Sequence, residues 1–312
     1  MERENENTWK SRLNEPAKKE IREKLRIDPD NEILSPLVDY IFKRIFTADE
    51  TNSKTALIDF INSILEHEND DKIIDLTIVN PQIPVDRGEQ KKSIFDIRAK
   101  YNSGRQAVIE MQKNPMSDFK KRSQHIISKA YANQEISGFN YDKLEKCYLI
   151  CITDFDIIKE TDEYIKDYRY RDRQGNELSD DETIIFLDLS KLTAVLNKPV
   201  DEMTNVEKWA IFFKYITDKS KQEILSKILE REAGIKMATN ILREVSKDEE
   251  TRAYYESELI FELDQRGRFK QAKEDGKIEM VKEMLLNGEE MAKIVKYSKF
   301  TEKEIKDIEK TL

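Results

Sequence analysis

The sequence contains few of the residues that build disulfide frameworks, zinc sites or histidine-based catalysis. Two of its 312 residues are cysteine and two are histidine. Cys147 and Cys151, in the run CYLIC, would point to one face of a strand. With His67 and His125 as the only histidines, they cannot assemble a thiolate zinc site. We interpret them as buried thiols in a reducing cytoplasm. The same scarcity disfavours a hydrolase of the Ser-His-Asp type and leaves His125 a poor candidate for a general base.

Several other features are missing. No stretch approaches the roughly 18 apolar residues of a membrane span, and the beginning MERENENTWK has no apolar core of the kind found in signal peptides. No glycine-rich phosphate loop is present. We therefore expect a cytoplasmic protein that needs neither a membrane nor a nucleotide cofactor. The net charge of −9 means that nucleic-acid binding would depend on local basic patches.

Glycine and proline are also scarce, at eight and seven residues, which favours a helix-rich chain. The pattern of charged and apolar residues predicts four segments. They are a charged lead-in over 1–31, a mixed α/β domain over 32–195, a helical extension over 196–270, and a small helical appendage over 271–312. The appendage has a helix-turn-helix-like outline, with a break at Asn287-Gly288 and a last helix starting at Thr301; a plain three-helix interaction module is an equal alternative.

Within the mixed domain, helical spacing gives way to strand-like runs and then returns. We expect helices in the segment ILSPLVDYIFKRIF and over 52–66, and from about Ser117 to a stop at Gly138. The expected strands are 73–80, 92–101, 105–112, 146–154 and 183–190.

A predicted hairpin carries the chemistry. The loop Asn102-Ser103-Gly104 joins two strands, and its last residue suits a hairpin that needs one positive φ. Asp96 and Glu110 are equally far from Ser103 along the chain, so they should face each other.

Two facing carboxylates repel unless a cation lies between them. Mg²⁺ accepts one or two carboxylates together with waters and phosphate oxygens, and it can activate water and offset phosphate charge. Gln112 projects from the same strand face as Glu110 and could hold a water or a carboxylate. The alternative is an exposed acidic pair neutralised by Arg98 or Lys100.

The order of these motifs is similar to that of a known family. SPLVDYIFKRIF, FDIRA, VIEMQ, FKKRSQHIISKAYANQ and the C-terminal KEDGKIEMVKEMLLNG resemble, in sequence and order, the Rpn recombination-promoting nucleases, which are PD-(D/E)XK nuclease family transposases. The resemblance covers most of 33–312. It implies an α/β fold with a PD-(D/E)XK restriction-endonuclease-like core (α-β-β-β-α-β) and a helical C-terminal extension.

The resemblance also implies cleavage of DNA with Mg²⁺ or Mn²⁺ held by Asp96 and Glu110. Asp39 matches an acidic family position and would complete the shell of the ion. Gln112 stands where the wider superfamily has a lysine, which departs from the pattern, and adjacent Lys113 is a second candidate for that role. A homodimer is also implied, since many nucleases of this superfamily cut both strands as dimers.

Basic residues follow the third strand on a predicted helix that begins beside Gln112. Its side chains could meet phosphates, and two of them, Arg122 and Tyr131, match family positions. The alternative is a solvated helix face. The candidate DNA-binding residues are Lys120, Lys121, Arg122, Lys129, Tyr131 and Gln134.

Two classes of function remain open on the sequence. The acidic pair with Gln112 favours an active metal-dependent DNA endonuclease of the recombination-promoting or transposase-like type. The missing lysine and the acidic balance favour a catalytically inactive DNA- or protein-binding module that keeps the fold. The sequence does not separate DNA from RNA as the substrate.

Overall fold

The computed structural model describes residues 33–48, 51–65, 72–79, 96–101, 103–134 and 140–312. The charged lead-in over 1–31, His67 and the helix stop expected at Gly138 lie outside these residues. The chain forms two compact units, Met1–Tyr255 and Glu256–Leu312, which are described separately below.

The first unit is built on a six-stranded mixed sheet in the order β1-β2-β3-β4-β6-β5. β3 and β4, and β4 and β6, pair in parallel, whereas the outer neighbours pair antiparallel. The strands are β1 (Leu76–Ile78), β2 (Ile97–Tyr101), β3 (Gln106–Gln112), β4 (Cys147–Thr153), β5 (Ile165–Arg171) and β6 (Glu177–Asp188).

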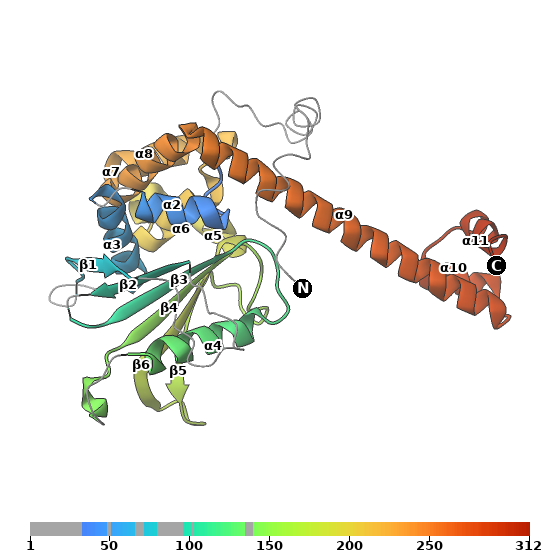
Figure 1. The fold of residues 1–312 in the computed structure, drawn as a ribbon, viewed down its shortest axis with the longest axis horizontal. Coiled ribbons are helices and arrows are strands. Elements are labelled where there is room, and N and C mark those ends of the chain that lie inside the picture. The colour runs from blue at the N-terminus through green and yellow to red at the C-terminus, as the bar shows by residue number, and fades with distance from the viewer. Residues whose placement is uncertain (1–32, 49–50, 66–71, 80–95, 102, 135–139) are drawn as a thin grey trace. The chain divides into compact units, whose positions relative to one another are not determined.

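Helices cover both faces of the sheet (Figure 1). On one face lie α2 (Asp39–Thr47), α3 (Asn52–Leu65), α5 (Thr193–Leu196), α6 (Asn205–Tyr215), α7 (Gln222–Arg231) and α8 (Ala233–Lys247). On the other face lies α4 (Phe119–Ala132). Short 3₁₀ turns occupy Tyr141–Lys143, Leu189–Lys191, Val200–Glu202 and Lys219–Lys221.

Alternation along the buried strands explains this layering. In β4, Tyr148 and Ile150 pack in the large core under α2 and α6, whereas Cys147 and Cys151 pack against α4. Side chains two residues apart share a sheet face, so an apolar run of this kind must be covered on both sides. The prediction that both cysteines are buried on one face is confirmed, and both are free thiols.

The large core extends beyond residue 195. Trp209 of α6 is fully buried among rings from α2 and α3, with its centroid 6.1 Å from Phe46 and 5.3 Å from Phe60. Its indole N–H donates to Asp59 Oδ2 at 2.8 Å. The helices that follow the last strand therefore complete the same core as the first two helices, and the first compact unit has no division at residue 195.

The sequence missed β5. Its pattern of half-buried and exposed residues lacks the apolar alternation that signals a strand, because β5 lies at the sheet edge. The other strands fall inside the expected ranges, except that β6 begins earlier, at Glu177. A turn that closes on Asp172 joins it to β5, since the Asp172 side chain accepts from the backbone N–H groups of Gln174 and Asn176.

The second unit contains the C-terminal part of α9 (Glu249–Leu286), α10 (Met291–Ser298) and α11 (Glu302–Glu309). Val281, Ile294 and Ile305 form its small buried core. The expected breaks are confirmed, because Gly288 has φ 70° after α9 and Thr301 caps α11 through a capping box with Glu304. None of the described helices is both long and apolar enough to cross a bilayer.

Candidate active site

The predicted hairpin register is present in the sheet. Ile97 pairs with Ile109 and Lys100 with Gln106, and Gly104 has φ 92° in the turn. Asp96 directly precedes β2 and faces Glu110, whose Oε1 accepts a hydrogen bond of 3.2 Å from the Asp96 backbone N–H. The local turn chemistry therefore brings the two carboxylates together at one end of β3.

Two cations accompany this carboxylate pair. Lys43 of α2 lies between two acidic residues, with Nζ 2.8 Å from Asp39 Oδ2 and 3.2 Å from Asp96 Oδ1. On the other side, Arg122 of α4 places Nη2 2.9 Å from Glu110 Oε2. The helices on the two faces of the sheet thus each contribute one cation to the same site.

The neutralising groups differ from those that the hairpin alone suggested. The Arg98 guanidinium donates to the side chain of Gln106, at 3.1 and 2.7 Å, and lies along the strand instead of beside the acidic pair. The alternative was an exposed acidic pair neutralised by Arg98 or Lys100. It is wrong for Glu110, because only 2% of the surface of this residue is accessible.

Burial dominates the electrostatics of the pair. It raises the pKa of Asp96 well above its usual value, and the carboxylates of Glu110 and Asp39 raise it further, while Lys43 opposes them. Burial likewise raises the pKa of Glu110, to about 7, against the opposing effect of Arg122. Two negative charges are therefore held here at a cost that additional positive charge would reduce.

The donor set fits a hard divalent cation with an incomplete protein shell. Asp96 and Glu110 supply two carboxylates, and Mg²⁺ commonly completes such a pair with water and phosphate oxygens. Asp39 has a side chain that is 51% exposed and meets the pair through Lys43. Within the described part of the chain, no three acidic, histidine or cysteine side chains cluster closely enough to surround an ion unaided.

The residues proposed for the superfamily lysine position lie at the end of β3. Gln112 is on the same strand face as Glu110, but its side-chain nitrogen donates to the Asn114 carbonyl oxygen at 2.9 Å. Lys113 follows the strand directly and is half-buried. Lys43, from α2, is a lysine that contacts an acidic member of the pair.

The first turns of α4 carry the most accessible of the candidate DNA-binding side chains. Lys120 and Lys121 are exposed, one turn or less from Arg122 and hence beside the acidic pair. Asp118 is the N-cap residue of α4, although its side chain makes no capping hydrogen bond.

The remaining candidates on this helix face the protein to a greater extent. Lys129 and Tyr131 are half-buried. Both polar ends of the Gln134 side chain bond to the Glu145 backbone, accepting from its N–H at 2.9 Å and donating to its carbonyl at 2.7 Å. Gln134 therefore fixes the segment that leads into β4.

Sequence analysis missed two contributions to this end of the sheet. Lys43 lies one helical turn after Asp39, and this i,i+4 spacing of opposite charges could have pointed to it. Asp154, which follows β4, pairs with Lys214 of α6, and its backbone N–H donates to the Gln112 carbonyl at 3.2 Å. Only the fold brings Lys214 to this position.

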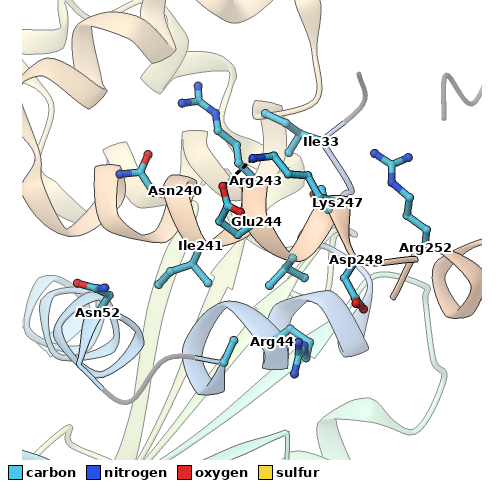
Figure 2. Close-up of a pocket in the computed structure, with 13 residues that line it drawn as sticks. Ile33, Arg44, Asn52, Asn240, Ile241, Arg243, Glu244, Lys247, Asp248 and Arg252 are labelled. Atoms are coloured by element: carbon cyan, nitrogen blue, oxygen red, sulfur yellow. Dashed lines mark hydrogen bonds and ion pairs between the residues drawn. The ribbon is translucent and has the colours of Figure 1, made fainter. Parts of the chain in front are cut away.

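The opposite side of α2 borders a separate hollow of about 800 Å³ (Figure 2). Its rim includes Arg44, Arg243 and Arg252, together with Lys247, which pairs with Glu244 at 2.7 Å. None of the carboxylates of the candidate site lines it. Lys43 and Arg44 are adjacent in α2, but Lys43 lies at the candidate site and Arg44 lines the hollow.

One of three comparisons with known proteins found a match. No match to a curated protein or to a solved structure was found. The sequence pattern of the family described as PD-(D/E)XK nuclease family transposase matches residues 36–272. That range contains the acidic pair, its two cations and the sheet that carries them, and the chain belongs to the PD-(D/E)XK nuclease family transposases.

Proposed function

We propose that the protein is a metal-dependent endonuclease that hydrolyses phosphodiester bonds in DNA, with Asp96 and Glu110 holding Mg²⁺ or Mn²⁺. The observation that carries the proposal is the buried carboxylate pair at the end of β3, in a chain whose family is nucleolytic. When bound, the divalent ion would lower the pKa of a water and offset charge on the scissile phosphate.

The residues of the chain divide the remaining work. The backbone N–H of Met111 donates to Asp96 Oδ2 at 2.7 Å and fixes the direction of that carboxylate. Arg122 holds Glu110 from α4. Asp39 and Gln112 are proposed to complete the site, as a further ligand and as a holder of the attacking water. Lys113 remains a second candidate for the latter role.

Lys43 is a further candidate for the function of the absent lysine. Its ammonium lies 3.2 Å from Asp96 and reaches the site from α2 instead of from β3. A lysine at that position can orient a water or stabilise charge on the phosphate regardless of the element that supplies it.

Exposed Lys120 and Lys121 would position the DNA backbone, because salt-dependent phosphate contacts need no particular base. Arg122, Lys129, Tyr131 and Gln134 would act from less exposed positions on the same helix. A second copy of the chain would be needed to cut both strands at once, and a homodimer remains part of the proposal.

A noncatalytic binding module is the competing function, and one observation favours it. Lys43 and Arg122 each form an ion pair with one carboxylate of the site. The two functions differ in metal binding, since a binding module would keep these ion pairs, whereas a nuclease would add a dication to the carboxylates.

Plasmid nicking by the purified chain tests the proposal, with Mg²⁺ or Mn²⁺, with EDTA, and with Glu110→Gln. Glu163→Gln is the matched control, because Glu163 is an exposed carboxylate far along the chain from the pair. Cleavage that needs metal and is lost only in Glu110→Gln is the expected result. Equal cleavage by the two variants would contradict the site, and absence of both cleavage and Mg²⁺ binding in the folded chain would favour the binding module.

A further inference from the structure

A second hollow, of about 370 Å³, opens between α4 and the β5–β6 hairpin. This volume is at the small end of the range of ligand pockets. Two isoleucines, Ile127 and Ile184, provide apolar surface. The other residues that line it are polar or aromatic: Gln124, Ser128, Tyr168, Arg169, Tyr170 and Glu182. We refer to it as the Tyr168–Glu182 pocket.

The carboxylate of Glu182 has an unused acceptor. Its Oε2 atom is buried and has no hydrogen-bond donor among the described residues, whereas Oε1 accepts a long bond of 3.5 Å from the Tyr170 hydroxyl. A buried acceptor without a donor destabilises the folded state. Burial also raises the pKa of Glu182, which the hydroxyls of Ser128 and Tyr170 oppose. Glu182 lines the pocket, and a turn of its side chain would bring this acceptor to N–H groups that enter from outside.

Aromatic rings flank this acceptor. Tyr168 and Tyr170 are 42% and 51% exposed, on an edge strand where large rings are not needed for the core. The Tyr168 ring makes an edge contact with buried Phe186, with centroids 5.9 Å apart and planes at 77°, so its orientation is fixed by packing. Exposed and oriented rings are the usual platforms on which bases of single strands stack.

The pocket lies within reach of the candidate active site along α4. Glu182 pairs with Cys147 of β4, and Cys147 pairs with Gln106 of β3. Glu110 follows Gln106 by four residues on β3. Strand rise and spacing place the two glutamates roughly 16 Å apart. That separation corresponds to about five nucleotides at the rise of one B-form strand. On α4, Arg122 contacts Glu110, and Gln124, two residues later, is exposed and lines the pocket.

We propose that the Tyr168–Glu182 pocket binds an unpaired guanine of the DNA strand that enters the candidate active site. Guanine offers N1–H and N2–H₂ side by side, and a carboxylate accepts such a pair with both oxygens. Its ring system stacks against the tyrosines. The base must be unpaired, since these N–H groups belong to its Watson–Crick edge. The place of the pocket in cleavage depends on the proposed endonuclease function, but binding of the base does not.

Fluorescence anisotropy in EDTA separates the two questions, because no cleavage is then involved. The probes are labelled oligothymidylates that carry, at one central position, guanine, hypoxanthine or thymine. Hypoxanthine keeps the shape and N1–H of guanine but lacks the N2 amino group. The full-length chain is compared with Glu182→Gln, Tyr168→Ala and the control Glu163→Gln, each checked for folding by circular dichroism.

The expected result is binding about fivefold tighter to the guanine probe than to the hypoxanthine probe, with this preference lost in Glu182→Gln and kept in Glu163→Gln. Tyr168→Ala should weaken binding of the guanine probe by about tenfold, and this exposed position keeps the test valid if Glu182→Gln does not fold. Equal affinity for the three probes, or a guanine preference that survives Glu182→Gln, would overturn the proposal. Guanine preference in a chain that never cleaves DNA would support the pocket and refute only the endonuclease.

Discussion

Replacing Glu110 with glutamine removes a buried charge while keeping nearly the same shape. In the metal-free protein, burial holds the pKa of this carboxyl at about 7, compared with an ordinary value of 4.5. Between about pH 4.5 and 7, the folded state therefore keeps the Glu110 proton that the unfolded state has released. Since the folded state binds more protons in that window, the free energy of unfolding falls as the pH rises through it.

The difference between the two pKa values corresponds to about 3 kcal/mol. Solvent screening does not reduce this energy, because the Glu110 side chain is only 3% exposed. Glutamine cannot accept from both Arg122 and the Asp96 backbone N–H as a carboxylate does, and losing one such bond costs about 1 kcal/mol. At pH 8 in EDTA, Glu110→Gln should thus be more stable than the native chain by about 2 kcal/mol.

Urea unfolding followed by circular dichroism between pH 5 and 8 measures this difference. The gain from the substitution should shrink as the pH falls and be absent near pH 5, where the pH-dependent part no longer exceeds the cost of about 1 kcal/mol for the lost hydrogen bond. Added Mg²⁺ should stabilise the native chain at pH 8 and have little effect on Glu110→Gln. A variant that is less stable than the native chain at pH 8 in EDTA, or a gain independent of pH, would refute the reasoning.

Three further outcomes are expected. Lys43→Met should lower the Tm in EDTA, because Asp96 loses its cation. In thermal scans, Mg²⁺ should raise the Tm of this variant by more than it raises the Tm of the native chain. Gly234→Ala should destabilise the protein by about 1–3 kcal/mol in urea unfolding, since a Cβ there would lie 2.3 Å from Asp59 Oδ2. Its control, Gly267→Ala, is at an open position of a helix and should be neutral or slightly stabilising. Lys121→Gln should weaken DNA binding at low salt and reduce the slope of log K against log salt by about one, measured by anisotropy in EDTA.

Local features of the sequence were sufficient to place the acidic pair. The Asn102-Ser103-Gly104 loop fixes which residues of the hairpin face each other, and the apolar alternation of the two strands fixes which side each residue takes. Both are properties of a short segment, so Asp96 and Glu110 could be paired without knowledge of the rest of the chain. The helix breaks near Gly288 and Thr301 were predictable for the same reason.

The cations around Asp96 and Glu110 could not be predicted from local sequence. Lys43 and Arg122 reach it from helices on opposite faces of the sheet, and helical periodicity says which residues share a helix face but not which strand that face will meet. The edge strand β5 was missed because exposure on both faces leaves no apolar pattern to detect.

The sequence by itself therefore determined the elements whose signals are local: the hairpin, its facing carboxylates, the buried central strands and the C-terminal helix breaks. Tertiary structure alone decided what neutralises the carboxylates and how far the core extends past residue 195. It also decided that Glu182 and the tyrosines of β5 lie beside α4. These depend on contacts between residues far apart in the chain, such as Trp209 with Asp59, whose closeness results from packing of whole helices against the sheet.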